Sequence, residues 1–208
     1  MNASRSLSFF VLFLTLFILN TFFVFQTGFM EDIDRRVYEF LFVFKSAGRL
    51  RISHWLTFPG NGATLYVLAG LFILWFVVQR RFGAAIWYFA SLAGGFQLNA
   101  FLKICFERVR PVGYDPAYLP HTFAYPSGHA FDSFVFYFLT LLIISGKWPG
   151  PLRVLTLFLA VLLVLSIGAS RITLGVHWLS DVTGGLFLGA AWVFLNLVLV
   201  KKLKEKDL

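Results

Sequence analysis

Six long apolar stretches restrict the fold of this chain more than any other feature. They cover residues 7–28, 63–79, 83–105, 128–145, 152–169 and 181–200. Each is close to the roughly 20 apolar residues that an α-helix needs to cross a bilayer. Of the 208 residues, 59% are hydrophobic and 13% are charged, against about 25% charged in soluble domains. The sequence predicts an all-α polytopic membrane protein with six transmembrane helices in a single membrane-embedded domain, residues 1–208.

The stretch 30–51, between the first two apolar stretches, mixes charged residues with one apolar helical face. The apolar residues recur at intervals of three and four, namely Met30, Ile33, Val37, Leu41 and Phe44. This spacing predicts an amphipathic helix that lies in the membrane interface. Two interpretations stay open: the helix borders an entrance for lipid, or it is a linker on the surface.

The basic residues that give the net charge of +8 lie between the apolar stretches. They therefore indicate membrane orientation and contact with anionic groups, and not nucleic-acid binding. Lys and Arg number nine on each predicted side, and setting aside four that fall in the candidate site leaves nine against five. This bias predicts both termini in the cytoplasm. The first stretch lacks a small-residue cleavage site, so we expect it to be retained as a helix.

One polar cluster lies between the last two apolar stretches. Residues 170–181 contain Arg171, His177 and Asp181. Because His177 and Asp181 are four positions apart, a helix here would place both on one face. A carboxylate beside an imidazole holds one tautomer and stabilises the cation that forms when the other ring nitrogen reacts. Taken alone, the segment is equally consistent with a helix start that carries incidental polar residues.

A second cluster begins at the end of the third stretch, on the same predicted face of the membrane. Lys103 lies in its last turn, and Arg110 follows in the loop 107–127, which contains four of the seven prolines. Two cations that approach from a helix end and from a loop can converge on one anion. Cations that extend to the membrane surface would give the same pattern.

A third cluster, Ser127, Gly128 and His129, begins the fourth apolar stretch on that face. Glycine allows the backbone to approach a ligand closely, and the free amides of a helix start bind anions. Ser127 adds a hydroxyl donor, and His129 can carry a proton. An ordinary capped helix start is the alternative.

Together the three clusters supply cations, a helix start and two histidines, which suits a phosphate group. The sequence contains no carboxylate cluster that would require a metal, and we expect no cofactor. Asn99 is one turn before Lys103, and Asp132 is three residues after His129. Both are candidates for contacts that support the site, or else they form a polar lining without a chemical role.

The three clusters carry a resemblance to a known family. Lys103 with Arg110-Pro111 has the form K-x6-RP, residues 126–129 read PSGH, and Ser170-Arg171 with His177 and Asp181 has the form SR-x5-H-x3-D. These motifs and their order resemble the type-2 phosphatidic acid phosphatase superfamily, in its integral membrane branch. The signature region spans residues 103–181, and the chain departs from it at no signature position.

The resemblance implies a role for each signature residue. His177 is the expected nucleophile, which forms a phosphohistidine, and Asp181 orients and stabilises it. His129 is the expected acid and base for the leaving oxygen and the water. The residues expected to bind the phosphoryl oxygens are Lys103, Arg110, Ser127, Gly128 and Arg171.

The expected function is hydrolysis of a terminal phosphate or pyrophosphate from a membrane lipid. The short chain resembles bacterial members of the phosphatidylglycerophosphatase B, undecaprenyl diphosphatase and lipid A 1-phosphatase type. Candidate substrates are phosphatidylglycerophosphate, undecaprenyl diphosphate, phosphatidic acid and lipid A 1-phosphate, with water as the second reactant and no protein partner inferred. The site is then expected on the periplasmic or outer face of a bacterial inner membrane. Transfer of the phosphoryl group to another lipid, and lipid transport without catalysis, are the alternatives.

Overall fold

The computed structural model describes residues 3–44, 46–111, 121–145 and 148–206, the last six without their side chains. Within these ranges the regular structure is entirely helical. The chain runs through α1 (Ala3–Phe25), α2 (Phe29–Val43), α3 (Ala47–Thr57), the short 3₁₀ helix η1 (Phe58–Gly60), α4 (Gly62–Val78), α5 (Phe82–Phe106), α6 (Gly128–Ile144), α7 (Gly150–Thr173) and α8 (Leu179–Lys206). The prediction of an all-α fold is confirmed.

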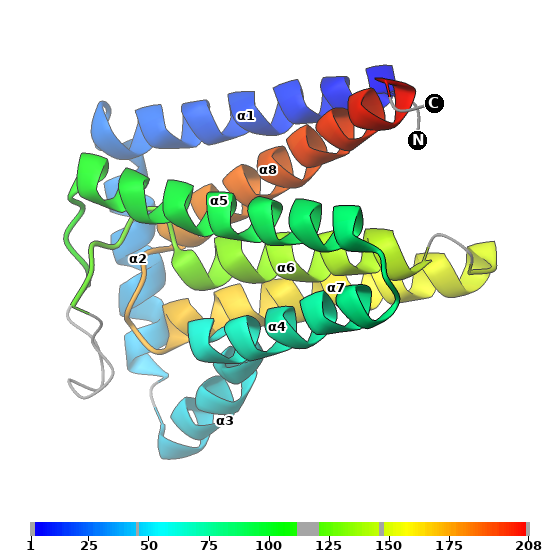
Figure 1. The fold of residues 1–208 in the computed structure, drawn as a ribbon. Helices are drawn as coiled ribbons and strands as arrows, with labels where there is room; N and C mark the ends of the chain where they lie inside the picture. Colours follow the sequence, from blue (N-terminus) through cyan, green and yellow to red (C-terminus); the bar gives the residue numbers. More distant parts are fainter. Residues whose placement is uncertain (1–2, 45, 112–120, 146–147, 207–208) are drawn as a thin grey trace.

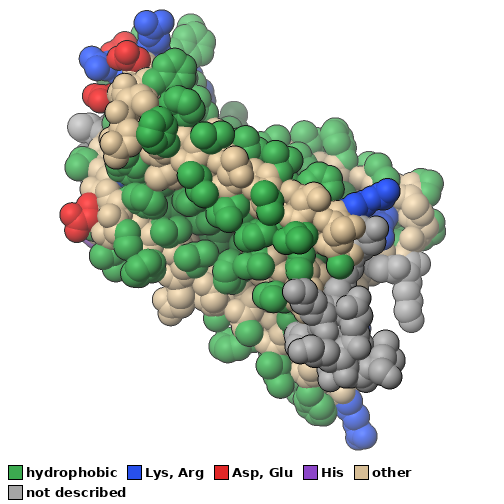
Figure 2. Space-filling view, turned by 90° about the horizontal axis from the view of Figure 1, so that it is seen from above, with side chains coloured by type: hydrophobic (Ala, Val, Ile, Leu, Met, Phe, Trp, Pro, Cys, Tyr) green, Lys and Arg blue, Asp and Glu red, His purple; other side chains and the backbone are tan. Residues whose placement is uncertain are grey.

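Five segments of the described chain are long and apolar enough to cross a membrane. They are Ala3–Phe25, Ala47–Val78, Phe82–Phe106, Gly150–Thr173 and Leu179–Val200. Figure 2 shows hydrophobic side chains over most of one face, with charged side chains towards its rim. The sixth predicted span, α6, is apolar but has 17 residues, so the count of six spans stays a prediction.

Helix α6 lies in the middle of the helix bundle, between α5 and the pair α4 and α7 (Figure 1). Phe131, Val135, Phe136 and Leu139 on this helix are all fully or almost fully buried. One of its polar groups has a partner on a neighbouring helix, since the hydroxyl groups of Thr140 and Tyr88 lie 2.6 Å apart. The residues of α6 are buried or half-buried along its whole length, which explains why most of them are apolar.

The first and last helices, α1 and α8, lie side by side, and the N-terminal end of α1 lies beside the C-terminal end of α8 (Figure 1). Asn20 of α1 joins them, because its amide group donates to the carbonyl of Ser180 (3.1 Å) and accepts from the hydroxyl of Thr183 (2.9 Å). Farther along, Phe194 stacks on Phe9 and Phe13. The N-terminal helix is therefore fixed directly to the helix that carries Asp181.

The single helix expected over residues 30–51 is wrong. The structure has two helices there: α2 ends at Val43, and Ser46 caps the start of α3 by accepting a hydrogen bond from the Arg49 amide (3.3 Å). A serine at this position satisfies an amide that a helix start leaves open, so it favours a new helix over continuation. The position of α2 and α3 in the membrane interface stays a prediction.

Some expectations lie outside the described residues. They concern the middle of the proline-rich loop, 112–120, with Pro116 and Pro120, as well as Lys45 and Lys147. The side chains of the basic C-terminal segment, 201–208, are also outside the description.

Candidate active site

The predicted site residues gather at one end of the helix bundle. The C-terminal ends of α5 and α7 and the N-terminal ends of α6 and α8 meet there, and α2 crosses this end (Figure 1). Because these helices alternate in direction, residues near positions 103, 128, 171 and 181 come to the same level. The prediction that the three clusters lie on one face of the bundle is therefore confirmed.

His177 and Asp181 are in contact, but not on one helical face. Helix α7 ends at Thr173 and α8 starts at Leu179, so His177 lies in the connecting turn. Asp181 reaches back from the first turn of α8 and accepts from the Trp178 amide at 2.8 Å. The same oxygen, Oδ2, lies 3.3 Å from Nδ1 of His177. The expected i,i+4 geometry is thus wrong, and helix capping by Asp181 produces the contact instead.

Arg110 fixes the tautomer of His177. Its Nη1 lies 2.9 Å from Nε2 of His177 and donates to the Val176 carbonyl at 2.7 Å. A guanidinium group has only donors, so Nε2 must accept, and the ring proton resides on Nδ1 facing Asp181. The imidazole therefore presents a lone pair on Nε2.

The charges around His177 keep its ring neutral. Burial, followed by the positive charges of Arg110, Lys103 and Arg171, holds the pKa of His177 well below its usual range. Burial lowers the pKa of Arg110 to about 10, while the charge of Asp181 acts in the opposite direction. At neutral pH the pair therefore consists of a charged guanidinium and an uncharged imidazole.

Lys103 contacts the loop that leads into α6. Its Nζ donates to the carbonyls of Phe123 (2.9 Å), Ala124 (3.3 Å) and Pro126 (2.6 Å). Arg110 binds the same loop through the carbonyls of Thr122 (2.6 Å) and Phe123 (3.1 Å). Both cations of the second cluster thus hold residues 122–126 in place beside the start of α6.

The start of α6 carries several polar groups directed into the site. Ser127 is fully buried, and its hydroxyl has no hydrogen-bond partner among the described residues. A methyl group on Gly128 would meet Oδ2 of Asp132 at 3.5 Å, Oδ1 of Asn99 at 3.6 Å and Cε of Lys103 at 3.8 Å. Asn99 and Asp132 therefore lie around the Gly128 backbone, next to Lys103.

His129 and Arg171, the remaining predicted site residues, lie near the others. His129 lies within electrostatic range of Arg171, His177, Arg110 and Lys103. Arg171 is buried in the last turn of α7, and its Nη1 donates to the hydroxyl of Thr57 at the end of α3 (3.0 Å). The structure thus brings every predicted site residue to one place, whereas His121 lies exposed in the loop.

Sequence reasoning missed Asp34 of α2 and left the role of Arg108 open. Arg108 Nη1 contacts Oδ1 of Asp181 at 2.5 Å, and Nη2 contacts Oδ2 of Asp34 at 2.7 Å. Asp34 also accepts from the amide of Ser180 at 2.9 Å. A signal was present, because Asp34 lies four residues after Met30 and three before Val37, on the apolar face of the helix.

Two glycines allow α8 to approach the start of α6. A methyl group on Gly185 would lie 2.6 Å from the Ser127 carbonyl, and one on Gly184 would lie 2.7 Å from the ring of Tyr125. The amide of Ser127 in turn donates to the Asp181 carbonyl at 2.9 Å. Close backbone approach at these glycines therefore sets the distance between the first cluster, residues 170–181, and the third.

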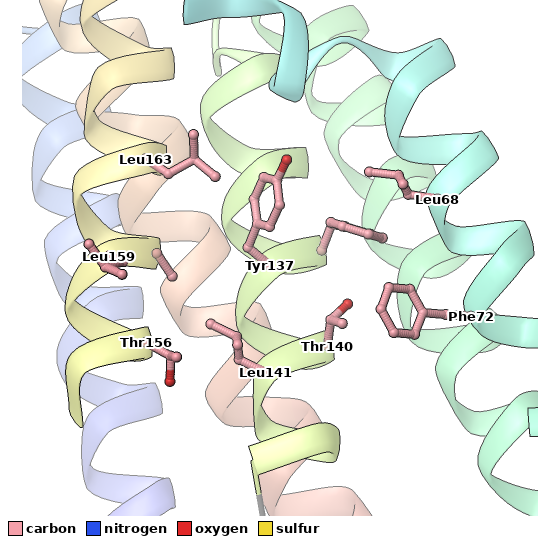
Figure 3. Close-up of a pocket in the computed structure, with 10 residues that line it drawn as sticks. Leu68, Phe72, Tyr137, Thr140, Leu141, Thr156, Leu159 and Leu163 are labelled. Carbon is pink, nitrogen blue, oxygen red and sulfur yellow. The ribbon is translucent and has the colours of Figure 1, made fainter. Parts of the chain in front are cut away.

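Two of the cavities in the described part of the chain bear on the site. One of about 350 Å³ is formed by α4, α6 and α7, with Leu68, Phe72, Tyr137 and Leu163 among its lining residues (Figure 3). Its lining contains no charged residue, so it lacks groups for chemistry on a phosphate. The other, of about 320 Å³, is lined by Asp34, Arg108 and Trp178 among others and lies beside the site.

Known proteins resemble this chain in sequence and in fold. The model of the PAP2 superfamily matches residues 84–205. Phosphatidylglycerophosphatase B of Bacillus subtilis is 33% identical over 111 residues, 52% of this chain and 52% of that protein, so the match spans about half the length of this relative. Undecaprenyl-diphosphatase of Sulfolobus acidocaldarius is 29% identical over 150 residues, 67% of this chain and 69% of that protein.

A solved structure has the same fold over nearly the whole chain. It is the crystal structure of a transmembrane PAP2-type phosphatidylglycerolphosphate phosphatase from Bacillus subtilis, with a TM-score of 0.81 and 24% identity. The superposition covers 95% of this chain and 96% of the other. Together with the apolar helices, this likeness identifies the chain as an integral membrane protein.

Proposed function

The chain belongs to the PAP2 superfamily, and on that premise we propose that it is a membrane lipid phosphatase which acts through a phosphohistidine on His177. One observation carries this proposal. The imidazole of His177 lies between a guanidinium at Nε2 (2.9 Å) and a carboxylate at Nδ1 (3.3 Å). This arrangement supplies a neutral nucleophile, a cation for the phosphoryl oxygens and an anion for the charge that develops on the ring.

In the first step, Arg110 moves its donor from Nε2 of His177 to the phosphoryl oxygens, the freed lone pair on Nε2 attacks phosphorus, and the bond from phosphorus to the lipid oxygen breaks. The ring becomes a cation when the P–N bond forms, and Asp181 stabilises it through Nδ1–H. His129, in its protonated form, gives a proton to the leaving oxygen, which departs as a lipid hydroxyl or a lipid phosphate.

In the second step, a water molecule attacks the phosphorus of the phosphohistidine. His129, now neutral, accepts a proton from this water, and the P–N bond breaks. Its electron pair returns to Nε2, so that His177 is neutral again and inorganic phosphate leaves. The enzyme thereby regains the protonation state in which the first step began.

Five residues are proposed to bind the phosphoryl group. They are Lys103, Arg110, Ser127, Gly128 and Arg171. The cations would exchange part of their contacts with loop carbonyls for stronger contacts with phosphate oxygens, since hydrogen bonds between ionised partners are about twice as strong as neutral ones. The hydroxyl of Ser127 and the first amides of α6 would donate to the same oxygens.

Asn99 and Asp132 are proposed to support this set. Their polar atoms lie 3.6 and 3.5 Å from the position of a methyl group on Gly128, and Lys103 lies next to them. Asp132 is within electrostatic range of Lys103. We assign to both residues the task of holding the Lys103 ammonium group near the start of α6.

The setting of the site supports a lipid as the substrate. A lipid that carries a terminal phosphate or pyrophosphate can remain in the bilayer while its headgroup reaches the end of the bundle. The names of the two relatives favour phosphatidylglycerophosphate and undecaprenyl diphosphate. We propose a bacterial inner membrane location, with cytoplasmic termini and the site on the periplasmic face.

The decisive experiment measures phosphate release from a panel of purified lipids in detergent micelles, together with transfer of labelled phosphate to an acceptor lipid. We expect release from at least one lipid, and a labelled enzyme that is stable in base and labile in acid. His177→Ala is expected to lose both signals, by about 10⁴-fold or more in kcat. Full turnover by this variant would exclude His177 as the nucleophile, and label in the acceptor lipid would identify a phosphotransferase.

A further inference from the structure

Helix α2 sends one carboxylate into the site and leaves its other charges in solvent. The side chain of Asp34 is 2% exposed, whereas those of Glu31 and Asp32 are 74% and 73% exposed. A buried carboxylate is costly unless charged and polar partners compensate it. The contacts of Asp34 therefore indicate what this part of α2 is for.

Within the described chain, the hydrogen bonds of Asp34 are made with Arg108 and Ser180, the two residues beside Asp181. Its Oδ1 accepts from the amide of Ser180 at 2.9 Å, and its Oδ2 accepts from the hydroxyl of the same residue. Arg108 donates from Nη2 to Oδ2 of Asp34 at 2.7 Å and from Nη1 to Oδ1 of Asp181 at 2.5 Å. One guanidinium thus bridges two buried carboxylates, and Ser180 lies between them.

Because of this bridge, the two carboxylate oxygens of Asp181 have different partners. Oδ1 is held by Arg108, and Oδ2 is left for the Trp178 amide and for Nδ1 of His177. The planar guanidinium group of Arg108 fixes the orientation of the Asp181 carboxylate relative to Asp34, because both of its terminal nitrogens, Nη1 and Nη2, are hydrogen-bonded at the same time.

The bridge also balances charge. Paired with Arg108 alone, Asp181 would be neutralised and would stabilise a cation on His177 poorly. Asp34 supplies the second negative charge, so that the cluster of Asp34, Arg108 and Asp181 keeps a net charge of −1 beside the nucleophile.

We propose that Asp34 is a positioning residue for the nucleophile, acting through Arg108 and Ser180 to hold Asp181 oriented and negatively charged against His177. The proposal rests on the phosphohistidine mechanism given above. It makes α2, which lies outside the family signature, a working part of the phosphoryl-transfer site. Its effect falls on the formation of the phosphohistidine and not on lipid binding.

The test compares Asp34→Asn with Asp32→Asn, which removes the same charge from an exposed position on the same helix. The measured quantities are kcat, KM and the single-turnover rate constant for phosphoenzyme formation. For Asp34→Asn we expect that rate constant and kcat to fall roughly 10- to 100-fold with KM within about twofold, and for Asp32→Asn we expect wild-type values. A rate constant reports only folded, reactive enzyme, so partial misfolding of the variant does not mimic the effect.

Arg108→Lys provides a second measurement, since lysine keeps the charge but cannot bridge both carboxylates. We expect a similar loss, and we expect the double variant Asp34→Asn/Arg108→Lys to lose little more than either single variant. Equal rate constants for Asp34→Asn and Asp32→Asn, or a change confined to KM, would overturn the proposal. A wild-type protein that releases no phosphate from any lipid would instead contradict the proposed function itself.

Discussion

Nη1 of Arg110 and Nε2 of His177 lie 2.9 Å apart, so the proposed nucleophile faces a cation with the nitrogen that must attack phosphorus. The contact orients the ring and keeps the attacking lone pair free of a proton. It also places a donor that is proposed to bind phosphate directly beside the proposed point of attack. Release of the Nε2 lone pair and phosphate binding are thus linked, in this proposal, through one pair of residues.

Replacing Arg110 should change the pH dependence of the reaction. Burial and then Arg110 are the largest causes of the lowered pKa of His177. Loss of the positive charge makes protonation of His177 easier, so its pKa rises and the acidic limb of kcat/KM moves upward. We expect the acidic limb for Arg110→Gln to lie at a higher pH than that of the wild type.

Arg110→Lys is the matched control, because it retains the positive charge but lacks the planar guanidinium group. Its acidic limb should stay near that of the wild type while its rate falls. The phosphate group of the substrate also titrates, with a second pKa of about 6, but identically for all variants. An acidic limb that does not move in Arg110→Gln would mean that the pKa of His177 does not govern it.

His129→Ala should impair lipid substrates far more than substrates with a good leaving group. A lipid alkoxide needs a proton as it leaves, and loss of a general acid costs typically 10²- to 10⁴-fold. A p-nitrophenolate leaves without a proton, so phosphoenzyme formation from p-nitrophenyl phosphate should be nearly unaffected. Single-turnover rates with both substrates measure this contrast, and equal losses would rule out His129 as the acid.

Chelators should leave the rate unchanged. The three cations and the start of α6 are proposed to bind the phosphoryl group without a metal. Turnover in excess EDTA, and after dialysis against it, is therefore expected to equal that of the untreated enzyme. Loss of activity that returns with Mg²⁺ or Mn²⁺ would contradict this prediction.

Gly185→Ala should damage both stability and activity. Its methyl group would lie 2.6 Å from the Ser127 carbonyl, which is backbone and cannot move away cheaply. Overpacking of this kind costs about 1–3 kcal/mol, which should lower the thermal midpoint in detergent and reduce kcat. Gly70→Ala in α4 is the control, since a methyl group there meets nothing within 4 Å. Similar midpoints for both variants would contradict the close approach.

The local sequence was sufficient to predict which residues form most of the candidate site, but not how they are arranged. The spacing of Lys103, Ser127, His129, Arg171 and His177 predicted a common phosphate site, because motif residues at helix ends fall at one level of an antiparallel bundle. The contact of His177 with Asp181 was expected for the wrong reason. Whether a segment near a helix start lies inside or before the helix depends on capping, which sequence patterns locate only to within a few residues.

Contacts over long sequence distances could not be predicted. Asp34 meets Ser180 across 146 residues, and Thr57 meets Arg171 across 114. Such pairs depend on how α2 and α3 dock on the bundle, and the periodicity that reveals an amphipathic helix does not name its partners. The break at Ser46 was missed because apolar spacing of three and four continues across it.

The hydrogen bond from Arg171 to Thr57 has a consequence for how such proteins diverge. Thr57, like Asn20 and Asp34, precedes the region of residues 84–205 that matches the family. The reacting groups thus reside in one half of the chain, and several of the groups that hold them reside in the other. Substitutions before residue 84 can therefore alter the support of the proposed reacting groups while those groups themselves stay unchanged.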